Sequence, residues 1–102
     1  MRNALRLPAL AAAMLATCPA PAALPPKYQR LAELNAVLAN RAVGEALGDT
    51  PIDSVVYVRT DLYRVTAGRC RIDARIVGLP MPEGVVGARR FEVRAGQRVC
   101  AR

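Results

Sequence analysis

Residues 69–77 alternate between polar and apolar side chains, and this alternation constrains the fold more than any other feature of the 102-residue chain. Successive side chains of an extended strand point to opposite faces. One predicted face carries Cys70, Ile72, Ala74 and Ile76, and the other carries Arg69, Arg71, Asp73 and Arg75. The pattern therefore predicts a sheet that is buried on one face and in contact with water on the other.

Residues 62–67 and 90–95 alternate in the same way. Residues 54–59 also predict a strand, with Val56 and Val58 on one face and Val55 and Tyr57 on the other. Residues 97–100 favour a short edge strand that returns to the strand at 69–77. The stretch 78–90 contains two prolines and three glycines, which make it too irregular for a helix or a strand. We therefore expect a mainly antiparallel sheet of three to five strands.

Ahead of the strands, apolar residues recur at helical spacing between residues 27 and 47. The stripe predicted to be buried consists of Tyr28, Leu31, Leu34, Leu38, Ala42, Ala46 and Leu47, and Val37 and Val43 widen it. Glu33 falls on the opposite, solvent side of this predicted helix. The fold class that follows is α+β, with one N-terminal amphipathic helix packed on the sheet.

The cysteines give a second constraint. Cys70 and Cys100 are predicted to form one disulfide, whose closed loop of about 30 residues stabilises a small domain. The alternative is a reactive thiol or a metal-binding pair, but the two cysteines have neither C-x-x-C spacing nor any histidine to accompany them. The third cysteine, Cys18, lies in the N-terminal region.

The N-terminal region has the three-part layout of a secretory signal peptide. Two arginines precede an apolar run at residues 7–16, and Ala20-Pro21-Ala22 supplies an A-x-A cleavage site. We expect a signal peptide at residues 1–22, a Pro-rich tether at 23–26 and a single domain at 27–102. The processed chain is expected to be periplasmic or secreted and not transmembrane. The alternative is a lipoprotein, because Leu15-Ala16-Thr17-Cys18 resembles a lipobox with Thr17 as the departure from its pattern.

The residue inventory argues against catalysis. The chain has no histidine, and its eight carboxylates are scattered without a local acid–base pair. It contains no glycine-rich phosphate loop and no clustered metal ligands in sequence. We therefore expect a non-catalytic binding or structural protein of the cell envelope, with no cofactor and no metal.

Two surfaces are candidates for binding. The first is the solvent-exposed face of the sheet, from which four arginines are predicted to project: Arg64, Arg71, Arg75 and Arg94. Their guanidinium groups could bind an anionic surface or an envelope protein. The chain has 15 Lys+Arg against 8 Asp+Glu. The alternative interpretation is that the excess of Arg over Lys reflects a bias in genomic base composition and not a selected binding site. Nucleic acid is not an expected partner, because the few aromatic residues provide no stacking platform.

The second candidate is the irregular stretch 78–90. Its apolar residues are Leu79, Met81, Val85 and Val86. A loop stiffened by proline can present such side chains to a partner, which suggests an inhibitor or regulator of an envelope hydrolase. The competing interpretation is that these side chains fold back over the open end of the core.

Overall fold

The structure is a computed structural model that describes residues 24–102. The elements are α1 (Pro26–Ala39), α2 (Arg41–Leu47), β1 (Ser54–Arg59), β2 (Leu62–Ala67), β3 (Cys70–Gly78), β4 (Phe91–Ala95) and β5 (Val99–Cys100). The fold is α+β with a mainly antiparallel sheet, as expected. The predicted signal peptide at 1–22 and the lipidation alternative at Cys18 lie outside the described residues.

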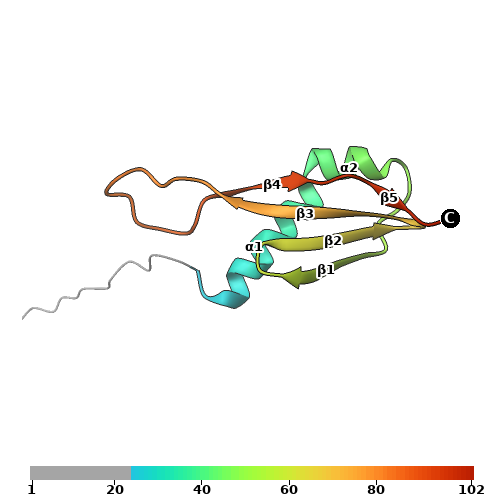
Figure 1. Cartoon of the computed structure of the whole chain (residues 1–102). Coiled ribbons are helices and arrows are strands. Elements are labelled where there is room, and N and C mark those ends of the chain that lie inside the picture. Colours follow the sequence, from blue (N-terminus) through green and yellow to red (C-terminus); the bar gives the residue numbers. More distant parts are fainter. Residues whose placement is uncertain (1–23) are drawn as a thin grey trace, which may run out of the picture.

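The strands form a single sheet in the order β1-β2-β3-β4, and every pairing is antiparallel. The short β5 pairs with the beginning of β3, opposite the edge that β2 occupies. β4 and β5 therefore follow one another along the same edge of β3 (Figure 1). The register places Cys70 opposite Cys100, and the two residues form the predicted disulfide.

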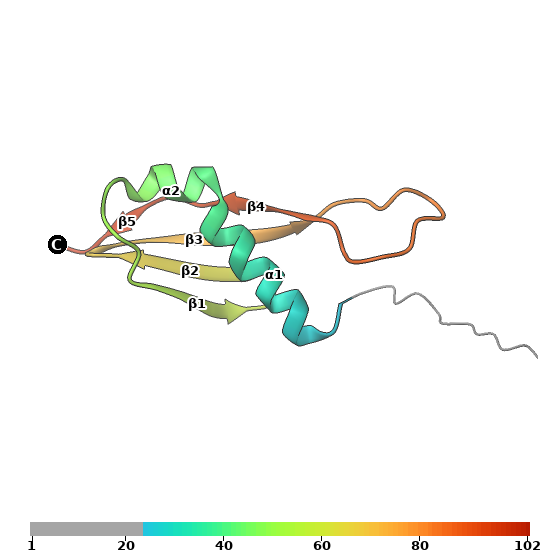
Figure 2. The same cartoon turned by 180° about the vertical axis from the view of Figure 1, so that it is seen from behind.

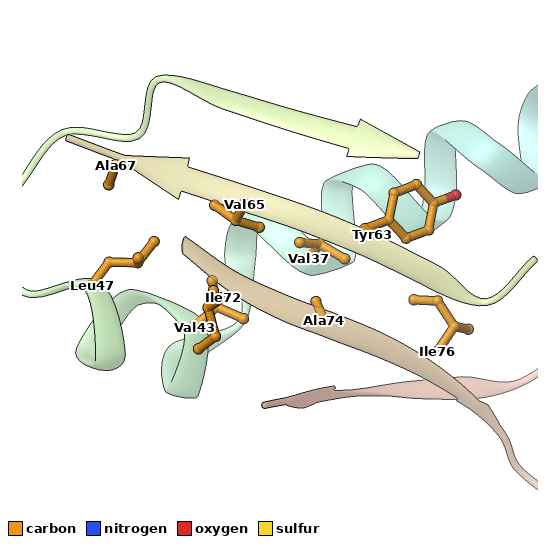
Figure 3. Close-up of a cluster of buried hydrophobic side chains, with 9 residues drawn as sticks. All are labelled: Val37, Val43, Leu47, Tyr63, Val65, Ala67, Ile72, Ala74 and Ile76. Carbon is orange, nitrogen blue, oxygen red and sulfur yellow. The ribbon is translucent and has the colours of Figure 1, made fainter. Parts of the chain in front are cut away.

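Both helices cover one face of this sheet and leave the other face uncovered (Figures 1 and 2). The core lies between the two layers. Its buried residues are Val37, Val43 and Leu47 from the helices and Tyr63, Val65, Ala67, Ile72, Ala74 and Ile76 from the sheet (Figure 3). The alternation of residues 69–77 is thus confirmed, since the apolar set of β3 faces the helices.

The prediction of one continuous helix over residues 27–47 is wrong, because the chain breaks at Asn40. This residue is extended, with φ −71° and ψ 125°. Its side-chain oxygen accepts a hydrogen bond from the Val43 backbone N–H at 3.0 Å and so caps α2. Its side-chain nitrogen donates to the Val93 carbonyl at 3.2 Å. Asn40 therefore turns the chain while fixing it to β4.

The buried face of α1 also differs from the predicted stripe. Tyr28, Leu31 and Leu38 each remain about half exposed, with exposed fractions of 51–52%. The buried residues of α1 are Val37, which widens the predicted stripe, and Glu33, which the spacing predicts on the solvent side. A hydrogen bond from the Tyr63 hydroxyl compensates for the burial of the Glu33 carboxylate.

The loop at 79–90 extends beyond the end of the sheet (Figure 1). At its tip the Val85 backbone N–H donates to the Pro82 carbonyl at 3.1 Å, and Gly84 takes a positive φ of 81°. This arrangement is a tight turn that favours glycine. At the base of the loop the Leu79 N–H donates to the Arg90 carbonyl at 2.9 Å, which continues the pairing of β3 with β4.

Candidate anion-binding face

The uncovered face of the sheet carries most of the charge that the strands contribute, and we call it the open face. Strand alternation and register place on it the charged residues Arg59, Arg64, Arg71, Asp73, Arg75, Glu92 and Arg94. All four arginines singled out in the sequence are therefore brought to one surface. The middle of the open face forms a hollow of about 560 Å³, which is lined by four arginines and Asp73 together with Leu62, Val77 and the small residues Ala95 and Gly96.

Two of the five arginines are paired with the two carboxylates of the open face. Arg64 on β2 donates to both oxygens of Asp73 on β3, at 2.8 and 3.3 Å. This hydrogen bonding lowers the pKa of Asp73, and the charges of Arg64, Arg71 and Arg59 act in the same direction. Arg94 donates to Glu92, two residues away on β4, at 2.6 Å. Both carboxylates are thus already occupied.

The other three arginines of the open face, Arg59, Arg71 and Arg75, have no ion-pair partner within 4.0 Å among residues 24–102. The open face therefore carries five positive charges against two negative ones. A guanidinium group presents a planar fork of N–H donors that matches carboxylate, phosphate or sulfate. Chemically, this surface can bind anions.

Arg59 is the member of this set that sequence reasoning missed. In a regular strand, Arg59 would share a face with Val55 and Tyr57, which pack toward the core side. A bulge between Tyr57 and Arg59 shifts the register, so that Arg59 pairs with Leu62. The side chain thereby reaches the open face, where it lines the hollow. No residue type in the sequence marks this bulge in advance.

A second polar cluster lies on the helix side of the sheet, next to the turn between β1 and β2. The Tyr63 hydroxyl donates to Glu33 Oε1 at 2.7 Å, and Gln29 donates to Oε2 at 2.8 Å. Burial, together with the hydrogen bond and the negative charge of Glu33, raises the pKa of Tyr63 to about 12. Tyr63 is consequently a neutral hydrogen-bond donor at physiological pH, and this cluster ties α1 to β2.

Arg89 connects this cluster to the protruding loop. Its guanidinium donates to Asp61, in the turn between β1 and β2, at 3.1 Å. It also lies 3.8 Å from Glu33 Oε2. Nearby, the Arg30 guanidinium stacks on the Tyr57 ring, with its carbon 3.6 Å from the ring centroid. These contacts hold the base of the loop and the start of α1 to the same end of the sheet.

The four apolar loop residues predicted as a partner site are not equivalent. Val85 and Val86 at the tip are 51% and 61% exposed. Leu79 and Met81 are partly buried. The exposed apolar surface of the loop is therefore concentrated at its tip.

In comparisons with known proteins, no protein-family model, curated protein or solved structure matches the chain. Within residues 24–102, no helix is long and apolar enough to cross a membrane. The same residues contain no group of three or more acidic or cysteine side chains placed to hold a metal ion. The class that the fold defines is a two-layer α+β domain with an open, arginine-rich sheet face.

Proposed function

We propose that this protein is a small exported, disulfide-linked binding protein whose open face binds an anionic ligand or surface. The observation that carries the proposal is the charge on that face, where five arginines meet two carboxylates and both carboxylates are already paired. A basic surface without compensating acids attracts anions, and the strength of that attraction falls with ionic strength.

Export is proposed on two grounds. The first is the signal-peptide pattern of residues 1–22. The second is the disulfide between Cys70 and Cys100, because such bonds persist in oxidising compartments. Intact-mass measurement of the protein recovered from its native cells tests this step. We expect a chain that starts near Ala23 and whose two thiols appear only after reduction. A lipid-bearing start at Cys18 would instead indicate a membrane-tethered form, and an uncleaved Met1 would refute export.

A binding role is favoured over catalysis because the groups that usually perform proton transfer are missing or engaged. The sequence has no histidine. Asp73 and Glu92 of the open face are held by arginines. The raised pKa of the buried Tyr63 keeps that phenol protonated.

The binding step is tested by chromatography on immobilised heparin. We expect the double variant Arg71→Gln/Arg75→Gln to elute at a lower salt concentration than wild type, because two guanidinium groups of the open face are lost. The matched control is Lys27→Gln/Arg41→Gln, which removes the same charge from exposed positions on the helix layer. Equal elution of the two double variants would show that only net charge matters and would refute a specific face.

A second function, regulation of an envelope hydrolase through the loop, is favoured by one observation. The loop tip is shaped by a tight turn, fixed at its base, and exposes Val85 and Val86. A preorganised loop loses less conformational entropy on binding. The double variant Met81→Ser/Val85→Ser is expected to abolish this activity while leaving heparin binding intact. Unchanged inhibition of an envelope hydrolase by that variant would exclude the loop.

A further inference from the structure

The register of the sheet aligns three arginines of the open face in a single line across the strands. Arg59 on β1 is opposite Leu62 on β2, Leu62 is opposite Arg75 on β3, and Arg75 is opposite Arg94 on β4. We call Arg59, Arg75 and Arg94 the arginine row. Neighbouring strands are about 4.8 Å apart, so Arg75 lies one strand from Arg94 and two strands, or about 10 Å, from Arg59.

The positive charges of the arginine row are only partly balanced by acidic residues. Like charges directly opposite one another on neighbouring strands are destabilising, and Arg75 and Arg94 form such a pair. Glu92 balances Arg94 in part. The other carboxylate of the open face, Asp73, accepts hydrogen bonds from Nε and Nη2 of Arg64 in the adjacent row. An external anion between Arg75 and Arg94 would remove the repulsion.

The hollow along this row is lined by apolar as well as charged residues. Leu62 lies on the open face and lines the hollow, although only 7% of it is exposed. Val77 and Ala95 also line the hollow, and Gly96 lines its end beyond β4 without adding a side chain. A ligand that fits must therefore combine several anionic groups with a less polar surface.

We propose that the ligand of the open face is a linear acidic polysaccharide, bound across the strands with successive carboxylates along the arginine row. This inference rests on the proposed function and specifies its ligand. A single small anion can meet only the pair Arg75 and Arg94, because Arg59 lies two strands away. A sugar ring has less polar faces that can pack on the partly exposed Val77 and carries its charge at the ring edge, which suits a hollow lined by both arginine and apolar residues.

A flat anionic bilayer fits this geometry less well. The arginine row lies in a concave part of the open face, whereas Arg71 lies outside the residues that line the hollow. A planar surface would meet the exposed Arg71 at least as readily as the row. The comparison of Arg75 with Arg71 on the same strand and the same face therefore separates the two ligand classes.

The experiment is isothermal titration of the oxidised protein with galacturonic acid and its oligomers of increasing length, at low ionic strength. We expect affinity to rise with length until the oligomer spans the row and then to level off. Arg59→Gln and Arg75→Gln are each expected to weaken binding of the longest oligomer about tenfold or more, because each removes a charge-assisted contact. Arg71→Gln removes the same charge outside the hollow and is expected to weaken binding less than Arg75→Gln. Arg41→Gln, at an exposed position on the helix layer, is the matched control and is expected to change binding less than about twofold.

The outcomes separate this inference from the proposed function. If Arg71→Gln weakens binding as much as Arg75→Gln, or if the monomer binds as tightly as the oligomers, the row is refuted while anion binding stands. Binding to phosphatidylglycerol vesicles without binding to the oligomers would overturn the ligand class. Binding to neither probe, together with no retention on heparin, would refute both proposals. Thermal melting of each variant verifies that the fold is intact.

Discussion

Replacing Tyr63 by phenylalanine removes one hydroxyl group from the core and leaves Glu33 Oε1 without its hydrogen-bond donor. The two oxygens are 2.7 Å apart, and both side chains are buried. Gln29 donates to the other carboxylate oxygen, so it does not replace the lost contact. A buried hydrogen bond to a charged group contributes about 1.5–3 kcal/mol. We therefore expect Tyr63→Phe to lower the free energy of unfolding by about 2–3 kcal/mol at neutral pH.

The same substitution also removes a dependence on pH. The pKa of Tyr63 is raised to about 12 in the folded protein, whereas a tyrosine in the unfolded chain has a pKa of about 10. Folding therefore favours the neutral phenol. The resulting stability is present below the unfolded pKa and is lost as the pH rises through about 10 toward about 12. These two values predict that wild type loses about 0.8 kcal/mol by about pH 10.5 through this residue, and that Tyr63→Phe loses none.

Urea unfolding followed by far-ultraviolet circular dichroism, at neutral pH and at about pH 10.5, measures both effects. Tyr28→Phe is the matched control, because Tyr28 is 52% exposed and forms no side-chain hydrogen bond through its hydroxyl with residues 24–102. The stability difference between wild type and Tyr63→Phe should narrow at the higher pH. A difference below about 0.5 kcal/mol at neutral pH, or one that is independent of pH, would refute the assigned contact.

Four further variants test the fold. The variant Cys70→Ser/Cys100→Ser, which opens a loop with a sequence separation of 30, should lower the free energy of unfolding by about 3–4 kcal/mol in the chain-entropy model. Reduced wild type should match it in urea unfolding, and a loss below about 1 kcal/mol would contradict the model. Asn40→Ala removes the cap of α2 and should cost about 1–2 kcal/mol, so an unchanged Tm would contradict the capping role. Gly44→Ala should stabilise by about 0.5–1 kcal/mol, because an added Cβ meets no atom within 4 Å. Gly96→Ala should destabilise by about 1–3 kcal/mol, because its Cβ would lie 3.0 Å from a backbone oxygen of β3, and equal melting of the two alanine variants would refute this contrast.

The strands could be predicted because each face of the sheet has a uniform environment. A run of β-branched and aromatic residues placed β1 at its observed bounds, and the alternating pattern did so for β2 and assigned the residues of β3 to the correct faces. The same alternation brought four of the five arginines of the open face together. The fifth, Arg59, depends on a bulge, which is a feature of the backbone that residue types do not encode.

The helical region was less predictable because polar groups decide its packing. Periodicity placed Glu33 on the solvent side, since a carboxylate is rarely buried without a partner. Its partner is Tyr63, which is 30 residues away in the chain. Asn40 likewise breaks the helix through a contact with Val93, and that contact exists only in the folded protein. Long-range hydrogen bonds of this kind leave no local periodic signal in the sequence.

The position of the disulfide has a consequence for association between copies of this chain. β5 is only two residues long, and it covers the backbone of β3 at Cys70 and Arg71. So short a strand could separate readily, and an uncovered edge pairs with strands from other chains. The covalent bond between Cys70 and Cys100 keeps β5 in place. The disulfide therefore disfavours pairing of this part of β3 with a strand from another copy. Reduction is expected to let β5 separate and to expose the backbone of β3 at Cys70 and Arg71.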